Sequence, residues 1–435
     1  MHPATFKTGP KQLLQADEVI IDNYNKYYAA LKSPAVLAGL SFEERLYTAH
    51  EIVEGVKRED MYFYRRTNED FNMRCEGNNA VGINARPVNL ASNDYLGFTK
   101  HPVVIKAATN AIQQYGAASG SVPLLAGTTG LHKRFESELA SFLDFEKAIT
   151  YNSGYAANYG LLTALLTASD VAILDMSVHA SIIDGCCNTN KIYFSHNDPT
   201  SLKIALMKAT GYQNKLVIID GVYSMDGDIA LLDEIMAITK EEHAWLMVDE
   251  SHATGVVGGQ GKGTHSHFGL SEKATILTGS LGKALGGSGG YVAGSSELVS
   301  FLEITSRPFI FSTSIPQHCA AQLSAALCLL KTGDGALDRL WSNINYFKRG
   351  MDEIGFEPSQ AASAIIPVII RDEVKLLNFC SFLHHNNVFV NPVFYPVVSK
   401  KKSRIRISVT ALLKEDELSY SLDRIETAAN KFNIV

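Results

Sequence analysis

The chain has 435 residues, of which 46% are hydrophobic and 19% are charged. This balance is typical of a globular protein and excludes a disordered or fibrous chain. At about 150 residues per domain, the length predicts roughly two or three structural units. Lys and Arg number 39 against 45 Asp and Glu, and the net charge of −6 argues against a nucleic-acid partner.

The sequence contains no segment that would carry the protein into or across a membrane. No run of about 20 apolar residues occurs, and the N-terminus lacks the basic stretch and apolar core of an export signal. The six Cys residues include no Cys-x-x-Cys pair and are too few for a disulfide framework. We therefore expect a cytoplasmic protein with reduced thiols and no membrane span.

The first two predicted units are a leader and a large domain. Residues 1–90 form an N-terminal leader or arm, with helical spacing of apolar residues at 12–32 and 42–58. In the large domain, residues 91–315, short apolar strands alternate with helices. The strands are expected at 171–175, 215–220, 244–249 and 274–278, and the helices at 131–145, 199–210 and 231–242. This alternation predicts an α/β fold with a mainly parallel sheet covered on both faces.

The third predicted unit is a smaller C-terminal α+β domain, residues 316–435. Its apolar pattern is less regular than that of the large domain. Helices are expected at 317–331 and 415–432, and strands at 364–370, 388–392 and 404–409.

Asp249 and Lys283 are the main candidates for chemistry. Asp175, Asp220 and Asp249 each end a predicted strand, where ligands of open α/β sheets bind. The carboxylate of Asp249 could pair with a protonated pyridine nitrogen, or cap a helix or loop. Lys283 follows a strand in a glycine-rich segment. Most lysines are solvated, but one desolvated at a strand end has a lowered pKa and can form a Schiff base.

Two more features fit a planar, phosphorylated cofactor. His179 follows the strand that ends at Asp175, and its ring could stack on a cofactor or form a hydrogen bond at a helix start. Residues 152–155 precede a helical run, where free N–H groups can bind phosphate or form an ordinary turn. Each feature is common alone. Together they follow one order along the chain: the phosphate site at a helix start, then His179, Asp249, His252 and Lys283.

These residues lie in segments that resemble the α-oxoamine synthases, enzymes of the fold-type-I aminotransferase class that use pyridoxal 5′-phosphate (PLP). The resemblance covers roughly residues 88–430. It is carried by Ser92-Asn-Asp-Tyr-Leu-Gly97, Val248-Asp-Glu-Ser-His-Ala-Thr-Gly255, Thr278-Gly-Ser-Leu-Gly-Lys283 and residues 127–132, 179–186, 224–229, 306–313 and 404–406. It implies a large domain with a mostly parallel seven-stranded sheet between helices, followed by a smaller α+β domain.

The resemblance also implies roles for four catalytic residues. Lys283 would bind PLP as a Schiff base and move protons. Asp249 would pair with the pyridinium nitrogen, and His179 would stack on the ring. His252 would contact the ring hydroxyl or the substrate.

The same resemblance implies the residues that bind phosphate and substrate. The N–H groups of Gly154 and Tyr155 and the hydroxyl of Ser280 would bind the cofactor phosphate, and Ser224 would also lie at the cofactor. Ser312 and Thr313 would reach the phosphate of the neighbouring subunit, which implies a homodimer with shared active sites. Asn93 would lie near the substrate, and Arg406 would bind the amino-acid carboxylate. No metal is expected.

The implied reaction is the decarboxylative condensation of an amino acid with an acyl-CoA, giving an α-amino ketone, CoA and CO₂. Residues 388–393, residues 224–229 and the long leader favour a serine palmitoyltransferase-like enzyme of sphingolipid biosynthesis. Glycine C-acetyltransferase and 8-amino-7-oxononanoate synthase are the alternatives. Thr410-Ala-Leu-Leu413 lacks a His that many relatives carry, and Pro123 stands where some have Arg, so the substrate stays open.

Three other classes fit the sequence less well. A nucleotide-binding oxidoreductase would need a Gly-x-Gly-x-x-Gly turn or a P-loop, and neither is present. A non-catalytic partner subunit of a heterodimeric synthase would be expected to lack Lys283. A metal hydrolase is disfavoured because the 13 His form no His-Glu-x-x-His pattern.

Overall fold

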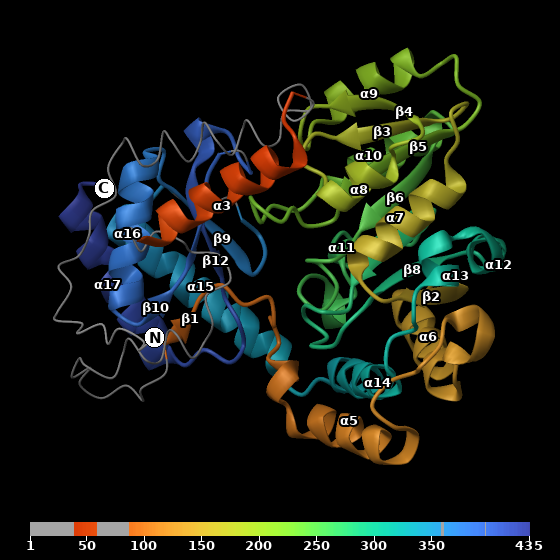
Figure 1. Cartoon of the computed structure of the whole chain (residues 1–435), viewed down its shortest axis with the longest axis horizontal. Helices are drawn as coiled ribbons and strands as arrows, with labels where there is room; N and C mark the ends of the chain where they lie inside the picture. Colours follow the sequence, from red (N-terminus) through yellow and green to blue (C-terminus); the bar gives the residue numbers. More distant parts are fainter. Residues whose placement is uncertain (1–38, 59–86, 358–360, 396) are drawn as a thin grey trace.

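The computed structural model describes residues 39–58, 87–357, 361–395 and 397–435 (Figure 1). Its largest sheet has seven strands in the order β2-β8-β7-β6-β5-β3-β4. They are β2 (Lys147–Tyr151), β3 (Val171–Asp175), β4 (Asn190–Phe194), β5 (Lys215–Asp220), β6 (Trp245–Asp249), β7 (Ile276–Ser280) and β8 (Gly290–Gly294). β8 is antiparallel to β2 and β7, and the remaining pairs are parallel. The expected mostly parallel seven-stranded sheet is confirmed.

Both faces of this sheet are buried, as the continuous apolar strands predict. Val171 and Ile173 of β3 pack into one hydrophobic cluster, and Ala172 and Leu174 pack into a second. Successive side chains of a strand point to opposite faces, so the two clusters are the two sides of one sheet. A strand covered on both sides has no position for a polar residue until it ends, which is where its aspartate stands.

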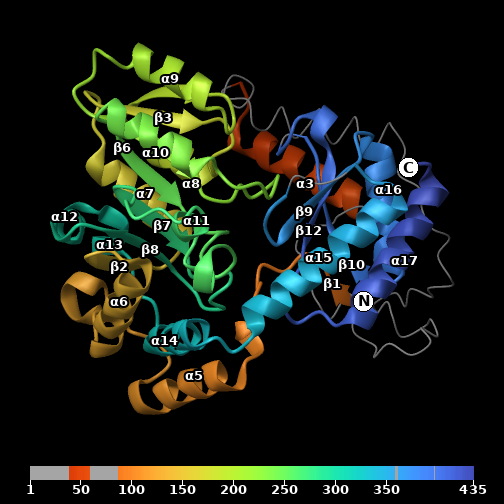
Figure 2. The ribbon, with the colours of Figure 1, turned by 180° about the vertical axis from the view of Figure 1, so that it is seen from behind.

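Helices form a layer on each face (Figures 1 and 2). The first layer consists of α6 (Gly130–Leu143), α9 (Pro199–Lys208), α10 (Leu232–Glu241) and α14 (Gln317–Thr332), with α5 (Pro102–Tyr115) packed on α14. The second layer consists of α7 (Gly154–Leu165), α8 (Ala180–Gly185), α12 (Ser296–Thr305) and α13 (Arg307–Phe311). Shorter elements are η1 (Phe98–Lys100), η2 (Pro123–Gly127), η3 (Gly259–Gly261) and α11 (Thr264–His267).

The C-terminal elements lie on the other side of the molecule (Figure 2). They comprise α15 (Ala336–Ile354), β9 (Ile365–Ile369), α16 (Glu373–His385), β10 (Val388–Phe389), β11 (Asn391–Val393), η4 (Lys400–Lys402), β12 (Arg404–Ser408) and α17 (Glu415–Phe432). Strands β11, β12 and β9 form an antiparallel sheet in that order.

Two expected strands differ from the structure. The strand expected at 388–392 is divided, because β10 pairs with β1 (Val88–Asn89) whereas β11 pairs with β12. The strand expected at 274–278 begins and ends two residues later, as β7. Of the two helices expected in the leader, the one at 42–58 is confirmed as α3 (Phe42–Arg58), and the one at 12–32 lies outside the described residues. The division into three units at residues 90 and 315 stays a prediction.

Among the described helices, none is long and apolar enough to cross a membrane. In the same part of the chain, no three His, Cys, Asp or Glu side chains are grouped so that they could bind a metal ion.

Candidate active site

The site begins where three neighbouring strands end. Asp220, the last residue of β5, is paired in register with Asp249, the last residue of β6, and Asp249 is paired with Thr278 of β7. Ser280 ends β7, and Lys283 follows it in the next turn. Parallel packing therefore brings together residues that are far apart in the chain.

Asp249 is a buried carboxylate held in a fixed orientation. The side-chain amide of Asn158 on α7 donates to its Oδ2 at 2.7 Å, and the N–H of Ser251 donates to its Oδ1 at 2.9 Å. The same Asn158 amide donates to Ser181 Oγ at 2.9 Å. The oxygens Asn158 Oδ1 and Thr278 Oγ1 beside it are buried without a hydrogen-bond partner in the described residues.

A chain of hydrogen bonds joins Lys283 to Arg406. Lys283 Nζ lies 2.8 Å from His252 Nε2, and His252 Nδ1 lies 2.8 Å from the hydroxyl of Tyr95. Tyr95 donates to Asn93 Oδ1 at 3.2 Å and accepts from Arg406 at 3.4 Å. Arg406 also donates to Asn93 Oδ1, at 3.2 and 3.3 Å. The predicted residues Asn93, His252, Lys283 and Arg406 thus form one connected group.

The direction of these bonds assigns the tautomer of His252. When Lys283 is protonated its amine can only donate to His252 Nε2, so the proton of His252 resides on Nδ1 and is donated to the Tyr95 hydroxyl. His252 Nε2 is then an acceptor that faces the amine of Lys283. This arrangement fixes the lysine nitrogen at one end of the chain and leaves it as a donor to an imidazole.

Burial favours the neutral forms of both bases. Burial lowers the pKa of Lys283 to about 8, against the opposing effect of Asp249. Burial, together with the charges of Lys283 and Arg406, lowers the pKa of His252 well below its ordinary value. A neutral amine at near-neutral pH is the form that attacks a carbonyl group.

His179 caps α8 beside the same strand ends. Its side chain Nδ1 lies 2.7 Å from Ser181 Oγ, and its N–H donates to Asp220 Oδ1 at 3.4 Å. Burial lowers its pKa, and the charges of Asp249 and Lys283 act on it in opposite directions. Burial first, and then the neighbouring charge of Asp249, raise the pKa of Asp220 well above its ordinary value. A neutral imidazole ring is suited to lie against a flat cofactor.

The expected phosphate residues come together at the start of α7. Gly154 is so close to β7 that an added Cβ would lie 3.1 Å from Ser280 Cβ. Ser153 caps the helix through Ala156 N–H, and no hydrogen bond within the described residues uses the N–H groups of Gly154 and Tyr155. The side chain of Tyr155 is exposed and donates to Asp184, so Tyr155 offers only its N–H to an anion.

The structure places Ser224, Ser312 and Thr313 differently. The carbonyl of Ser224 accepts from Arg406 Nε, so Ser224 contacts the arginine through its backbone. Ser312 and Thr313 line a separate pocket with Asn152 and residues of the loop before α6. No hydrogen bond among the described residues joins them to Lys283, and their contact with a neighbouring subunit stays a prediction.

These residues fit PLP. Lys283 would supply an amine for the aldehyde, Asp249 would supply a fixed buried carboxylate for the ring nitrogen, and Gly154, Tyr155 and Ser280 would supply donors for the phosphate. The oxygens of Asn158 and Thr278, which have no hydrogen-bond partner in the described part of the chain, mark polar positions beside the carboxylate.

Comparisons with known proteins agree with this chemistry. The family Aminotransferase class I and II matches residues 85–425. 8-Amino-7-oxononanoate synthase 1 of Bacillus subtilis is 40% identical over 359 residues, covering 82% of this chain and 92% of the relative. The Bacillus pumilus 8-amino-7-oxononanoate synthase is 41% identical, over 80% of this chain and 89% of its own.

Solved structures show the same relationship. Sphingomonas wittichii serine palmitoyltransferase is 30% identical with a TM-score of 0.78, covering 81% of this chain and 90% of that one. 8-Amino-7-oxononanoate synthase from Francisella tularensis is 26% identical with a TM-score of 0.69, covering 80% and 99%. The chain therefore belongs to the aminotransferase class I and II family. Within that family it is a PLP-dependent acyltransferase of the α-oxoamine synthase group.

Proposed function

We propose that the enzyme condenses alanine with a pimeloyl thioester to give 8-amino-7-oxononanoate. The observation that carries the proposal is the shared name of the relatives at 39–41% identity, each covered over about nine-tenths of its length. The product defines the substrates. Its carbons 1 to 7, which end in the ketone, correspond to the pimeloyl group, and carbons 8 and 9, the amino-bearing carbon and the methyl group, correspond to alanine without its carboxylate. This reaction takes precedence over the serine palmitoyltransferase-like one that the sequence alone favours.

The protein's own groups would each perform one task. Arg406 presents a guanidinium whose NH1 and NH2 are turned toward Asn93 and Tyr95, and it would pair with the substrate carboxylate. Lys283, once its amine is free, would take the proton from the α-carbon of the amino acid. Asp249 would keep the ring nitrogen protonated. The bound cofactor supplies an electron sink for the carbanion.

The ion pair between the substrate carboxylate and Arg406 would also orient the α-carbon. A fixed carboxylate at one end and the lysine at the other leave one side of the α-carbon for the acyl thioester. After the new carbon–carbon bond forms and the thiol leaves, the carboxylate departs as CO₂ and a proton replaces it on the α-carbon.

An exposed apolar face supports a homodimer. Leu124 and Leu125 of η2, Ile304 of α12 and Phe311 of α13 are each more than half exposed. Helix α13 contacts η2, α12 and α7, and α12 also contacts α7, so these exposed side chains stand on neighbouring elements around α13. A second copy of this chain would cover that face. Ser312 and Thr313 follow Phe311 directly, which would bring them into the interface.

The test is a substrate matrix with the purified enzyme. Alanine, serine and glycine would each be combined with acetyl-, pimeloyl- and palmitoyl-CoA, and kcat/KM measured with the product identified by mass. We expect alanine with pimeloyl-CoA to give the highest value, with Lys283→Ala as the inactive control. The highest value for serine with palmitoyl-CoA would instead favour the activity named for the solved neighbours and overturn the proposal, as would glycine with acetyl-CoA.

A further inference from the structure

The loop between β5 and α10, residues 221–231, connects the strand ends to the C-terminal unit. On the sheet side, the hydroxyl of Tyr223 donates to Asp175 Oδ2 at 2.9 Å. His196 lies between two carboxylates, 3.0 Å from Asp175 Oδ1 and 3.1 Å from Asp228 Oδ2. The loop is therefore attached to the ends of β3 and β4 by side chains at both of its own ends.

The middle of the loop is attached to the C-terminal unit. The carbonyl of Gly227 accepts from the N–H of Ala362 at 3.0 Å and from Ser363 Oγ at 2.8 Å. Gly227 has φ +71, and a Cβ there would lie 2.3 Å from the carbonyl oxygen of Ile365. Only glycine allows the loop to approach β9 this closely.

Arg404 makes a charged attachment to the same loop. Its side chain is only 1% exposed, and its NH1 donates to Asp226 Oδ1 at 2.7 Å and to the carbonyl of Met225 at 2.9 Å. A buried guanidinium needs such partners, because a buried charge without a counter-charge is strongly destabilising. Asp226 is therefore the charge that keeps Arg404 in place.

Arg404 and Arg406 share one face of β12. They are two residues apart on a strand, so their side chains point the same way. Arg404 holds residues 225 and 226, and Arg406 Nε donates to the carbonyl of Ser224, the residue before them. By fixing the loop through Arg404, Asp226 therefore also fixes the Ser224 carbonyl that orients the Arg406 guanidinium.

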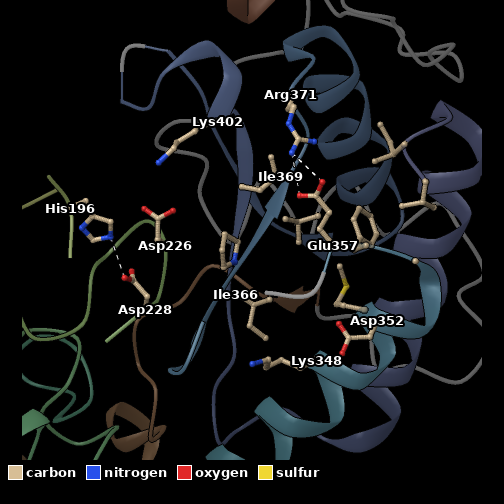
Figure 3. A pocket seen from close by; sticks show the side chains of 17 residues that line it. His196, Asp226, Asp228, Lys348, Asp352, Glu357, Ile366, Ile369, Arg371 and Lys402 are labelled. Atoms are coloured by element: carbon tan, nitrogen blue, oxygen red, sulfur yellow. Dashed lines mark hydrogen bonds and ion pairs between the residues drawn. The ribbon is translucent and has the colours of Figure 1, made fainter. Parts of the chain in front are cut away.

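Several polar groups that line the cleft beside this loop are already paired (Figure 3). Arg371 pairs with Glu357 at 3.1 Å, His196 pairs with Asp228, and Lys348 donates to the carbonyl of Ala361 at 2.7 Å. Asp226 lines the same cleft, and its partner Arg404 approaches it from β12. Each of the first three pairs lies within one unit, whereas the Asp226–Arg404 pair joins the large domain to the C-terminal unit.

We propose that Asp226 is a positioning residue for substrate recognition, which acts through Arg404 and the Ser224 carbonyl to orient Arg406. This inference rests on the proposed role of Arg406 in binding the amino-acid carboxylate. Asp226 contacts neither Lys283 nor Asp249, so its removal changes the binding of the amino acid and leaves the binding of PLP as it is.

The experiment compares Asp226→Asn with Asp352→Asn in the holoenzyme. Asp352 is an exposed carboxylate of the same cleft, and within the described residues its side chain makes no hydrogen bond or ion pair with the loop. We expect Asp226→Asn to raise the KM for the amino acid by about tenfold, with kcat and the KM for the thioester within about threefold of wild type. Asp352→Asn should leave all three constants unchanged.

A binding measurement separates positioning from general damage. Absorbance titration of the bound cofactor with alanine and with alaninamide gives the preference for a carboxylate. We expect Asp226→Asn to reduce that preference, and Arg404→Lys, which keeps the buried charge but cannot reach both acceptors, to reduce it as well. Arg404→Lys also provides the readout if Asp226→Asn does not fold.

The outcomes distinguish this inference from the proposed function. Arg406→Gln that abolishes the carboxylate preference while both Asp226→Asn and Arg404→Lys keep it would overturn the positioning role alone. Arg406→Gln with an unchanged preference would overturn the proposed role of Arg406, and the inference with it. Loss of PLP or an equal rise in both KM values in Asp226→Asn would also contradict the inference.

Discussion

At the residue scale, one hydroxyl joins the two ends of the site. Tyr95 is fully buried and contacts Asn93, His252 and Arg406. A polar side chain in such a position must have its hydrogen bonds satisfied. The Tyr95 hydroxyl meets this requirement by accepting from His252 and Arg406 and donating to Asn93. The orientation of Arg406 and the protonation of Lys283 are therefore parts of one network.

The lowered pKa of Lys283 predicts how cofactor attachment depends on pH. With a pKa of about 8, about a tenth of the lysine is neutral at pH 7 and nearly all of it at pH 9. Since the neutral amine attacks the aldehyde, we expect the rate of PLP attachment to the apoenzyme to rise about tenfold over this range and then level off.

Stopped-flow absorbance measures the rate, and borohydride reduction with peptide mapping identifies the lysine. The matched control is Lys262→Ala, which removes a partly exposed lysine paired with Asp144. A rate independent of pH, or cofactor trapped on another lysine, would contradict the assignment.

At the scale of elements, apolar periodicity predicted most of the sheet because burial on both faces makes the strands continuous. The aspartates that end β3, β5 and β6 were visible for the same reason. β2, β4 and β8 were not predicted. β2 and β4 are the two edge strands, and most of β4 is not buried, so its apolar pattern is weak. β8 begins and ends with glycine, which weakens its strand pattern.

Contacts between distant segments could not be predicted from periodicity. Asn158, which holds Asp249, lies inside an apolar helix, and only its place one turn after Gly154 could have suggested a role. Tyr95 belongs to the segment 92–97 that carries the family resemblance, but its partners Arg406 and His252 come from β12 and the turn after β6. The pairing of Arg404 with Asp226 depends on tertiary packing, because the two residues are far apart in the sequence.

The link between β3, β4 and the 221–231 loop predicts a pH-dependent stability. Burial alone would lower the pKa of His196, but hydrogen bonds to Asp175 and Asp228 outweigh it and raise the pKa to about 10. Because this folded value lies above the unfolded value of about 6.5, the contribution is full below pH 6.5 and is lost as pH rises through 10.

Urea unfolding of wild type and His196→Asn from pH 6 to pH 10 measures the difference in unfolding free energy. We expect it to be largest at pH 6 and to shrink steadily toward pH 10. A difference that stays constant or grows with pH would show that the charged form of His196 does not stabilise this link.

At the scale of the whole molecule, the predicted sharing of active sites requires two chains. The exposed apolar face on η2, α12 and α13 lies next to Ser312 and Thr313, the residues predicted to reach the partner's phosphate. Mixing inactive Lys283→Ala with inactive Thr313→Arg would form hybrids with one intact site. Since random exchange makes half of the dimers hybrids, we expect about a quarter of wild-type activity. Verified exchange without recovery, or a monomer in sedimentation, would contradict shared sites.

The reaction itself provides the most direct test of the central claim, that this fold performs a decarboxylative condensation. The measurement uses alanine labelled with ¹³C in its carboxyl group, and follows labelled CO₂, free CoA thiol and the amino ketone together with pimeloyl-CoA. The account predicts that all three appear in equal amounts and only when both substrates are present. Labelled CO₂ released without the thioester, or a keto acid formed in place of the amino ketone, would contradict it.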